Sequence, residues 1–572
     1  IPYLYAAMKP IRFLTLFFTA LALAANFSCS TVSKTPLTEA QLETKLREHI
    51  STLASDAYEG REAGSAGEIK ARDYIVKAFK SAGLKPKGEK GFLQPFTFTA
   101  GATFGPGTQL YVNNYSFKVN DDFTPLPYSG NGVITGYVAR LGYGIDDNKL
   151  GREDYKGKLN IAKKIFVMES GTPDGANPHG KFGEWSDLRK KLDIAIQRGA
   201  TAVIFINSDT AQADPKADFD HRISPVSIPV LFAKGKAAEL LRDSIVTNCT
   251  VGAEVIKVTK DAYNVCGYID NGAATTVVIG AHYDHLGYGH EGSLYRGEPA
   301  IHNGADDNAS GTAALIELGR DLRIRGPKHN NYLLLAFSGE EKGLLGSNYY
   351  VKHPTVDLTK VNYMLNMDMV GRLKKDEPVL ILSGTGTSPR WKTLVDSIET
   401  DQVEIKATES GVGPSDHTSF YLQNIPVLHF FSGTHADYHK PSDDEDKINY
   451  PGALTIIGMI RKTIALADGS GKLVFTKTKD ESNEDAPKFK VTLGVVPDYA
   501  FDGEGMRIDG VSDGKPAQKA GLLAGDVVVQ IGDYKVVDMM SYMKALGKFT
   551  KGETTTVKVK RGAEMLEKSI TF

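Results

Sequence analysis

Three short hydrophobic runs, each followed by residue types that bind metals, constrain the fold of this chain more than any other feature. Each run has the length and the aliphatic composition of a buried β-strand. The runs and the polar residues after them are 277–281 with His282 and Asp284, 332–337 with Glu340 and Glu341, and 364–367 with Asp368. Because ligands of open α/β sheets bind beyond the carboxyl ends of the strands, we expect these side chains to form one site.

The chemistry of these side chains, together with Asp306, predicts a metal site. The set contains imidazole and carboxylate groups but no thiolate, which suits zinc in a catalytic site better than in a structural one. Burying so many carboxylates together would cost much free energy without a cation to offset their charge. One histidine after a strand is most often an ordinary core or loop residue, so the prediction depends on the whole set.

The order of short motifs between about residues 280 and 445 resembles peptidase family M28, the co-catalytic zinc aminopeptidases. The motifs are His-x-Asp at 282–284, GADDNASG at 304–311, Glu-Glu at 340–341, Met-Asp-Met at 367–369 and YHKPSD at 438–443. The resemblance implies an α/β fold with a mixed-sheet zinc exopeptidase core of the phosphorylase/hydrolase-like type.

The same resemblance implies two zinc ions per chain and gives a role to each motif. Asp306 would bridge the two ions. The residues that complete the two zinc sites would be His282 and Asp368 for one, and Glu341 and His439 for the other. Asp307 is expected to shape the turn rather than to bind metal, and His285 to lie in the loop or at the rim.

Two further residues of these motifs would serve the chemistry without binding metal. Glu340 would be the general base that activates the metal-bound water. Asp284 would hydrogen-bond the far nitrogen of His282, the usual carboxylate–histidine–metal arrangement. The segment Ser415–His417 also resembles a family element near the site, and both a substrate-contacting and a purely structural role stay open for it.

The first residues predict a targeting segment at 1–29. Met8 is the expected start, because residues 8–12 are basic and residues 13–25 are apolar but too short for an ordinary membrane span. Residues 22–24 fit ordinary secretion, whereas Cys29 resembles a bacterial lipoprotein site. Both interpretations predict an exported bacterial protein, which is periplasmic, membrane-anchored through a lipid, or secreted.

Composition excludes some classes of partner and scaffold. The 572 residues suggest several domains, and 67 basic against 69 acidic residues give no reason to expect a nucleic-acid partner. Three cysteines exclude a disulfide-rich scaffold, although Cys249 and Cys266 could pair.

The peptidase is predicted to consist of two segments, 37–124 and 256–475, around an insertion. In the first segment, Glu59 and Arg61 are expected to be a structural ion pair or a loop anchor. Residues 125–255 alternate strand-like and helical runs and are similar to a protease-associated (PA) domain, with a merely structural insertion as the alternative. Residues 263–269 and the strand that starts near Val277 are expected to pair as a hairpin.

The C-terminal part predicts a peptide-binding module. Residues 476–488 are charged and read as a solvated linker. Residues 489–572 resemble a mostly β PDZ domain, in which Leu493, Gly494 and Val495 would bind the C-terminus of a peptide.

The sequence as a whole predicts an exported dinuclear zinc aminopeptidase that acts on peptides. The alternatives are a non-catalytic receptor or scaffold on the same fold, and a glutaminyl cyclase or other amidohydrolase. A non-catalytic relative would be expected to lose ligands or the general base, and all six positions are present here. The complete bridging set speaks against the cyclase, which shares the fold but uses one zinc.

Overall fold

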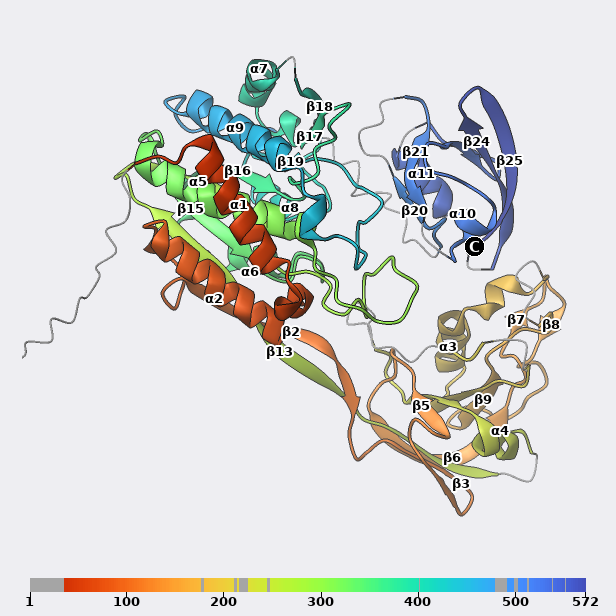
Figure 1. Cartoon of the computed structure of the whole chain (residues 1–572). Helices are drawn as coiled ribbons and strands as arrows, with labels where there is room; N and C mark the ends of the chain where they lie inside the picture. The colour runs from red at the N-terminus through yellow and green to blue at the C-terminus, as the bar shows by residue number, and fades with distance from the viewer. Residues whose placement is uncertain are drawn as a thin grey trace, which may run out of the picture.

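A computed structural model describes residues 35–175, 180–209, 213–215, 225–243, 247–400, 402–478, 491–497, 503–511, 514–537, 539–550 and 552–572. The predicted targeting segment 1–29 and most of the predicted linker 476–488 lie outside these ranges. Within the described ranges, the helices are all too short or too polar to cross a membrane. The chain forms three units, each around its own hydrophobic clusters (Figure 1).

The first unit is built on a nine-stranded mixed sheet. Its strand order is β1-β13-β15-β14-β16-β19-β17-β18, and β2 pairs with β13. The strands are β1 Lys85–Pro86, β2 Leu93–Phe104, β13 Val255–Ile269, β14 Thr275–His282, β15 Asn330–Phe337, β16 Val361–Met367, β17 Val379–Ser383, β18 Glu404–Thr408 and β19 Val427–Phe431. The parallel neighbours β15, β14, β16 and β19 form its centre.

The central strands are buried along almost their whole length because helices cover both faces of the sheet. Along β14, Val277 and Ile279 belong to one hydrophobic cluster, whereas Val278 belongs to the cluster on the other face. The helices on the first face are α1 Glu39–Leu53, α2 Ala66–Ser81, α5 Gly311–Arg325, α7 Pro389–Ile398 and α9 Tyr450–Ala467, and those on the second are α6 Leu345–Lys352 and α8 His417–Tyr421.

The expected hairpin between residues 263–269 and the next strand is wrong. Strand β15 lies between β13 and β14, antiparallel to the first and parallel to the second. A hairpin would leave β14 with one antiparallel partner, whereas its uninterrupted apolar sequence fits a strand between two parallel ones. Residues 270–272 therefore belong to a connection that skips one position in the sheet, and β15 fills that position.

The second unit is inserted between β2 and β13 and has its own eight-stranded sheet, in the order β4-β3-β12-β6-β9-β10-β11-β5. Its elements are β3 Gln109–Val112, β4 Tyr115–Phe117, β5 Phe123–Pro125, β6 Gly132–Arg140, β9 Ile165–Glu169, α3 Leu188–Gln197, β10 Ala202–Ile206, β11 Val230–Ala233, α4 Gly235–Arg242 and β12 Asn248–Ala253, with a small β7–β8 pair at Asp146–Asp147 and Arg152–Glu153. Because β3 and β4 pair within this sheet, the unit begins before the expected boundary at residue 125. The long β2–β13 ribbon joins it to the first unit (Figure 1).

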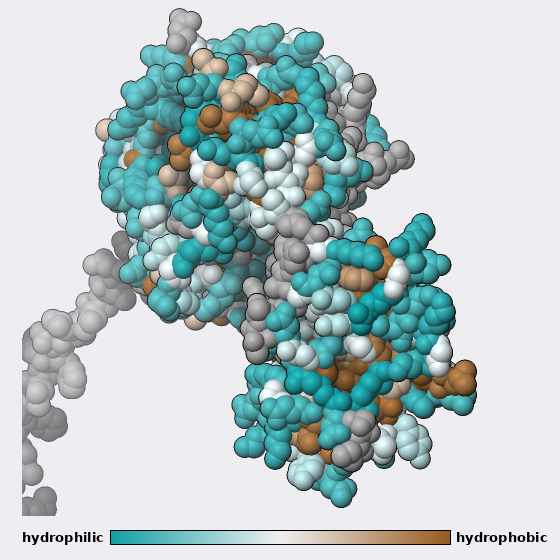
Figure 2. Space-filling model, turned by 90° about the vertical axis from the view of Figure 1, so that its right-hand side faces the viewer, coloured by the Kyte–Doolittle hydropathy of each residue, from teal (hydrophilic) through white to brown (hydrophobic). Residues whose placement is uncertain are grey.

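The third unit is a six-stranded sheet with two short helices. The strand order is β20-β21-β22-β24-β25, and β23 pairs with β22. The elements are β20 Val495–Pro497, β21 Met506–Val511, α10 Pro516–Lys519, β22 Val527–Ile531, β23 Tyr534–Lys535, α11 Met539–Leu546, β24 Thr554–Arg561 and β25 Glu564–Thr571. Figure 2 shows one face of the whole molecule, on which hydrophobic side chains lie in small groups among predominantly hydrophilic ones.

Candidate metal centre

The polar residues after the predicted strands converge at one edge of the first sheet. His282 is the last residue of β14, Asp368 follows β16, and Glu340 and Glu341 follow β15 by a short turn. Asp307 lies in the π-helical turn Ala305–Ser310 that leads into α5. The side chains that the sequence predicted to share one site therefore lie together, at the carboxyl ends of neighbouring parallel strands.

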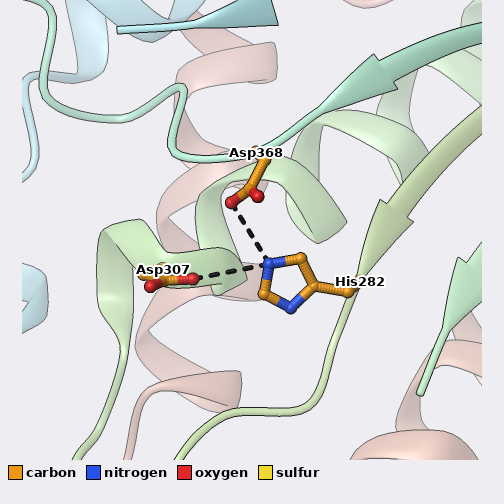
Figure 3. Close-up of side chains that lie close together, drawn as sticks. All are labelled: His282, Asp307 and Asp368. Carbon is orange, nitrogen blue, oxygen red and sulfur yellow. Dashed lines mark hydrogen bonds and ion pairs between the residues drawn. The ribbon is translucent and has the colours of Figure 1, made fainter. Parts of the chain in front are cut away.

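A first group of possible metal ligands consists of His282, Asp307 and Asp368. The His282 Nε2 atom is 3.1 Å from Asp368 Oδ1 and 3.4 Å from Asp307 Oδ1, so both carboxylates point to the same ring nitrogen (Figure 3). The other nitrogen, Nδ1, donates to the backbone carbonyl of Asp284 over 3.2 Å. That bond occupies Nδ1 and turns Nε2 toward the carboxylates, so Nε2 is the nitrogen through which a metal would be bound.

A second group adjoins the first through Asp307. The His439 Nε2 atom is 3.2 Å from Asp307 Oδ2 and 3.3 Å from Glu341 Oε2. His439 Nδ1 donates to the carbonyl of Gly292 over 3.0 Å, which fixes this ring in the same way as that of His282. His285 Nδ1 lies 2.7 Å from Glu341 Oε1, so this histidine is buried inside the cluster and not at the rim.

The expected bridging residue, Asp306, does not enter either group. Its Oδ1 accepts hydrogen bonds from the Gly371 amide over 2.6 Å and from the Ser310 hydroxyl over 3.0 Å, and its Oδ2 lies 3.2 Å from His435 Nε2. Asp307 instead directs its two oxygens at the two groups. The assignment from the sequence is therefore off by one residue, because neighbouring aspartates in a turn point in different directions.

Asp284 supports His282 differently from the expectation. Its carboxylate Oδ1 lies 3.8 Å from His282 Nδ1, too far for a hydrogen bond, and its backbone carbonyl accepts from the ring instead. The same Oδ1 accepts from the Glu340 amide over 3.1 Å. Burial, together with the charge of Glu341, raises the pKa of Asp284 to about 7, against the opposing effect of His282. The Asp284 carboxylate thus holds the segment that carries Glu340.

The adjacent glutamates differ in their electrostatic surroundings. Burial raises the pKa of Glu340 well above its usual value, and the charges of Asp368 and Glu341 add to the effect, although His282 opposes it. Burial also acts to raise the pKa of Glu341, but His439 and His285 outweigh it and the pKa lies well below the usual range. Neighbouring carboxyl groups with separated pKa values are typical of sites where one group is an acceptor of protons and the other stays ionised.

A cavity of about 760 Å³ opens beside both groups. Asp307, Glu340, Asp368 and His439 line its polar side. The hydrophobic part of the wall is formed by Leu294, Met369, Ile381, Val412 and Phe431. The volume lies within the range of small-ligand sites. The wall also includes Val495, which belongs to β20 of the third unit.

Arg61 fixes the two loops that carry the first-group residues. Its buried guanidinium donates to the carbonyls of Leu53, Tyr283, Asn303 and Gly304 over 2.6–2.9 Å. Of the two structural roles predicted for Glu59 and Arg61, an ion pair or a loop anchor, the structure shows Arg61 as an anchor, and Glu59 lies 3.5 Å from Lys70 instead. The position of Arg61 in the sequence, shortly before a helix, did not predict its hydrogen bonds to these carbonyls.

Asp443, the last residue of the YHKPSD motif, has a role in the site that the sequence did not predict. Its Oδ2 accepts from the amides of Asp306 and Asp307, each over 3.0 Å, and so orients the turn. Asp416 and His417 are buried behind the site, and His417 stacks on the cavity residue His429 at 4.4 Å between ring centroids. Burial raises the pKa of Asp416 to about 7. Of the two roles left open for this segment, the burial favours the structural one.

Cys249 and Cys266 are buried free thiols, so the pairing that the sequence left open does not occur. Their positions explain this result. Cys249 lies on β12 of the inserted unit, whereas Cys266 lies on β13 within the first sheet.

The fold and the site define an α/β domain with a cluster of histidine and carboxylate side chains that could hold metal ions at the carboxyl ends of its parallel strands. Residues 264–464 match the model of peptidase family M28, and residues 477–572 match the model of the PDZ domain. The chain thus contains an M28 peptidase domain and a PDZ domain. The PA assignment of the inserted unit stays a prediction.

Individual proteins that are similar to the chain are named aminopeptidases. A probable leucine aminopeptidase of Trichophyton verrucosum is 32% identical over 185 residues, which cover 31% of this chain and 47% of that protein. Aminopeptidase YwaD of Bacillus subtilis is 24% identical over 424 residues, covering 72% and 82%. The solved aminopeptidase of Aneurinibacillus sp. strain AM-1 is 24% identical with a TM-score of 0.43, and the match covers 77% of this chain and 97% of that one. The chain spans about half the length of the Trichophyton verrucosum protein and of other curated relatives that it matches.

Proposed function

We propose that the chain is a dinuclear zinc aminopeptidase, which hydrolyses the N-terminal residue from peptides. The observation that carries this proposal is the position of Asp307, whose two carboxylate oxygens face two different histidine–carboxylate groups within the M28 domain. The names of the similar proteins support the choice of aminopeptidase over other peptidase activities.

The residues present fit two zinc ions. His282 and Asp368 would hold one ion and Glu341 and His439 the other, with Asp307 between them. Both histidines use Nδ1 for a backbone carbonyl and direct Nε2 at the carboxylates, and the three carboxylates are largely buried, so a cation would offset charge that is otherwise costly. His285 lies beside Glu341 and could supply a further nitrogen. When bound, the two ions would polarise the scissile carbonyl and lower the pKa of a water molecule.

The chain itself would handle the proton. Glu340 lines the cavity beside the first group and is held by the Asp284 carboxylate. Its carboxylate would accept a proton from the attacking water and pass it to the amine of the leaving peptide. The hydrophobic wall of the cavity would take the side chain of the N-terminal residue. The PDZ domain would bind the C-terminus of a peptide through the segment of Leu493, Gly494 and Val495.

Mass spectrometry of a peptide pool tests the proposal. Half of the pool carries free N-termini and half is acetylated, and a chelator-treated sample is the control. We expect stepwise loss of N-terminal residues from the free peptides alone, abolished by the chelator. Cleavage of both halves would show an endopeptidase or carboxypeptidase instead, and an uncleaved pool with zinc-loaded protein would overturn the enzyme proposal.

A further inference from the structure

The cavity of the peptidase domain is completed by a residue from the PDZ domain. Val495 lines the same cavity as Glu340, Asp368 and His439, although more than 50 residues separate it from the last of these along the chain. In Figure 1, β20 lies on the side of the PDZ domain that faces the peptidase domain. Residues of both the peptidase domain and the PDZ domain therefore line this one cavity.

Val495 is the first residue of an edge strand. β20 pairs antiparallel with β21, with Val495 opposite Val511, and it ends the order of the sheet among the described residues. A terminal strand of this kind offers backbone hydrogen-bonding groups on its outer side. An extended peptide can add to such an edge as a further strand, which is the binding mode of PDZ domains.

The loop before β20 has two features that suit the end of a peptide chain. Gly494 has a φ of 72°, and its amide donates to the Thr492 hydroxyl over 2.9 Å, so the chain bends sharply next to the edge. The stem of Lys515 packs so closely over Gly494 that a Cβ at this glycine would be 2.1 Å from the Lys515 Cβ. The lysine thereby places a positive charge near the loop, where a carboxylate would be attracted.

We propose that one peptide substrate occupies both domains, with its N-terminus at the metal centre and its C-terminal residues added to β20. The inference rests on the proposed aminopeptidase function and specifies its substrates. These are peptides with a free C-terminal carboxylate, long enough to extend from Glu340 along β20 to the loop at Gly494. The PDZ domain thus selects substrates by length and by their C-terminal group.

Steady-state kinetics on paired peptides test the inference with the full-length, zinc-loaded protein. Each pair has one sequence ending in either a carboxylate or an amide, and the series runs from dipeptides to decapeptides. We expect kcat/KM to rise with length, and the carboxylate to be preferred about tenfold once the peptide is long enough to reach β20. An aminoacyl p-nitroanilide, which has no C-terminal segment, reports the peptidase activity alone.

The outcomes separate the two proposals. Chelator-sensitive hydrolysis of the p-nitroanilide with equal kcat/KM for carboxylate and amide at every length would overturn the two-domain substrate and leave the aminopeptidase intact. Failure to hydrolyse the p-nitroanilide and all of the peptides would overturn both proposals.

Two lysine variants of the PDZ domain give a matched comparison. Lys515→Gln should bring the ratio of carboxylate to amide kcat/KM close to one, because it removes the charge beside Gly494. Lys519→Gln, at an exposed position on α10, should keep the ratio of the unmodified chain. An unchanged ratio in Lys515→Gln would contradict the placement of the carboxylate at this loop, as would an equal loss in both variants.

Discussion

At the scale of single residues, the adjacent aspartates before α5 have different tasks. Asp307 faces both histidine–carboxylate groups, whereas Asp306 accepts hydrogen bonds from Gly371 and Ser310 and lies beside His435. Asp443 holds the amides of both. One residue of the pair therefore suits metal binding, and the other secures the turn.

Replacing these aspartates separately should distinguish their roles. Asp307→Asn should lose most of the bound zinc, because it removes charge from the position between the two groups. Asp306→Asn should retain both zinc ions while lowering thermal stability. Elemental analysis of the purified variants gives the zinc content per chain. Two zinc ions retained by Asp307→Asn, or lost only by Asp306→Asn, would restore the bridging role that the sequence suggested for Asp306.

A third replacement addresses the proton acceptor. Glu340→Gln should keep the zinc content and lower kcat by about 10²-fold or more, the usual scale for loss of a general base. The control is Glu377→Gln, an exposed glutamate in a loop of the same domain, which should leave kcat unchanged. Turnover close to that of the unmodified chain in Glu340→Gln would remove this residue from the role.

At the scale of elements, a buried polar network joins three helices on one face of the peptidase sheet. His49 of α1 lies 3.0 Å from Glu317 of α5 through Nε2 and 2.7 Å from the Tyr74 hydroxyl of α2 through Nδ1. Arg320 donates to the same Glu317 carboxylate. Burial alone would raise the pKa of Glu317, but the contacts with His49 and Arg320 lower it below its usual value.

The lowered pKa makes the stability of this helix layer depend on pH. The ionised Glu317 contributes stability above the pKa of the unfolded chain, near 4.5, and this contribution is lost as the pH falls through the lower folded-state pKa. Glu317→Gln should reduce the unfolding free energy at pH 7 by about 3 kcal/mol, the scale for a broken buried pair. In acid the difference from the unmodified chain should shrink.

Urea unfolding at neutral and acidic pH measures this effect. Glu43→Gln is the control, because Glu43 forms an exposed pair with Arg47 on α1 and should cost less than about 1 kcal/mol. A loss for Glu317→Gln that stays constant with pH would show that packing, and not the charge of Glu317, stabilises this layer.

The sequence predicted where strands and helices begin and end better than it predicted which strands pair and how loops meet. The strand ends at His282 and Asp368 and the start of α5 near Ser310 follow from hydrophobic patterns that are local in the chain. The pairing of β13 with β15 depends on contacts between distant residues, which a local pattern does not contain. The orientation of Asp307 and the burial of His285 likewise depend on how loops from different strands meet.

At the scale of the whole molecule, the hydrophobic clusters separate by domain. The PDZ domain has its own cluster and the inserted unit has three, whereas the groups that could hold metal ions, among the residues that the structure describes, all lie in the peptidase domain. The place of Val495 in the wall of the peptidase cavity could not be predicted from the local sequence, because it depends on how the domains are placed.

Chelation should therefore act on one domain. Removing zinc should lower the midpoint of the peptidase transition by about 10 °C, because ligand binding stabilises the folded state and the carboxylates would repel each other without it. The PDZ transition should not move. Differential scanning calorimetry with and without chelator measures both, and an equal shift of all transitions, or no shift, would contradict the assignment of the metal to the peptidase domain.

The ribbon of β2 and β13 has a consequence for the order of folding. It pairs Leu93 with Val265 at the peptidase end and Phe104 with Val255 at the inserted end. In an unfolded chain, closing this ribbon means ordering a loop of about 150 residues, with the entropy cost and slow rate of distant contacts. If the inserted unit folds first, Phe104 and Val255 are already neighbours, and the two strands can pair residue by residue from that end. The folded insertion would then hold the two segments of the peptidase domain together while its sheet forms, before the metal centre is assembled.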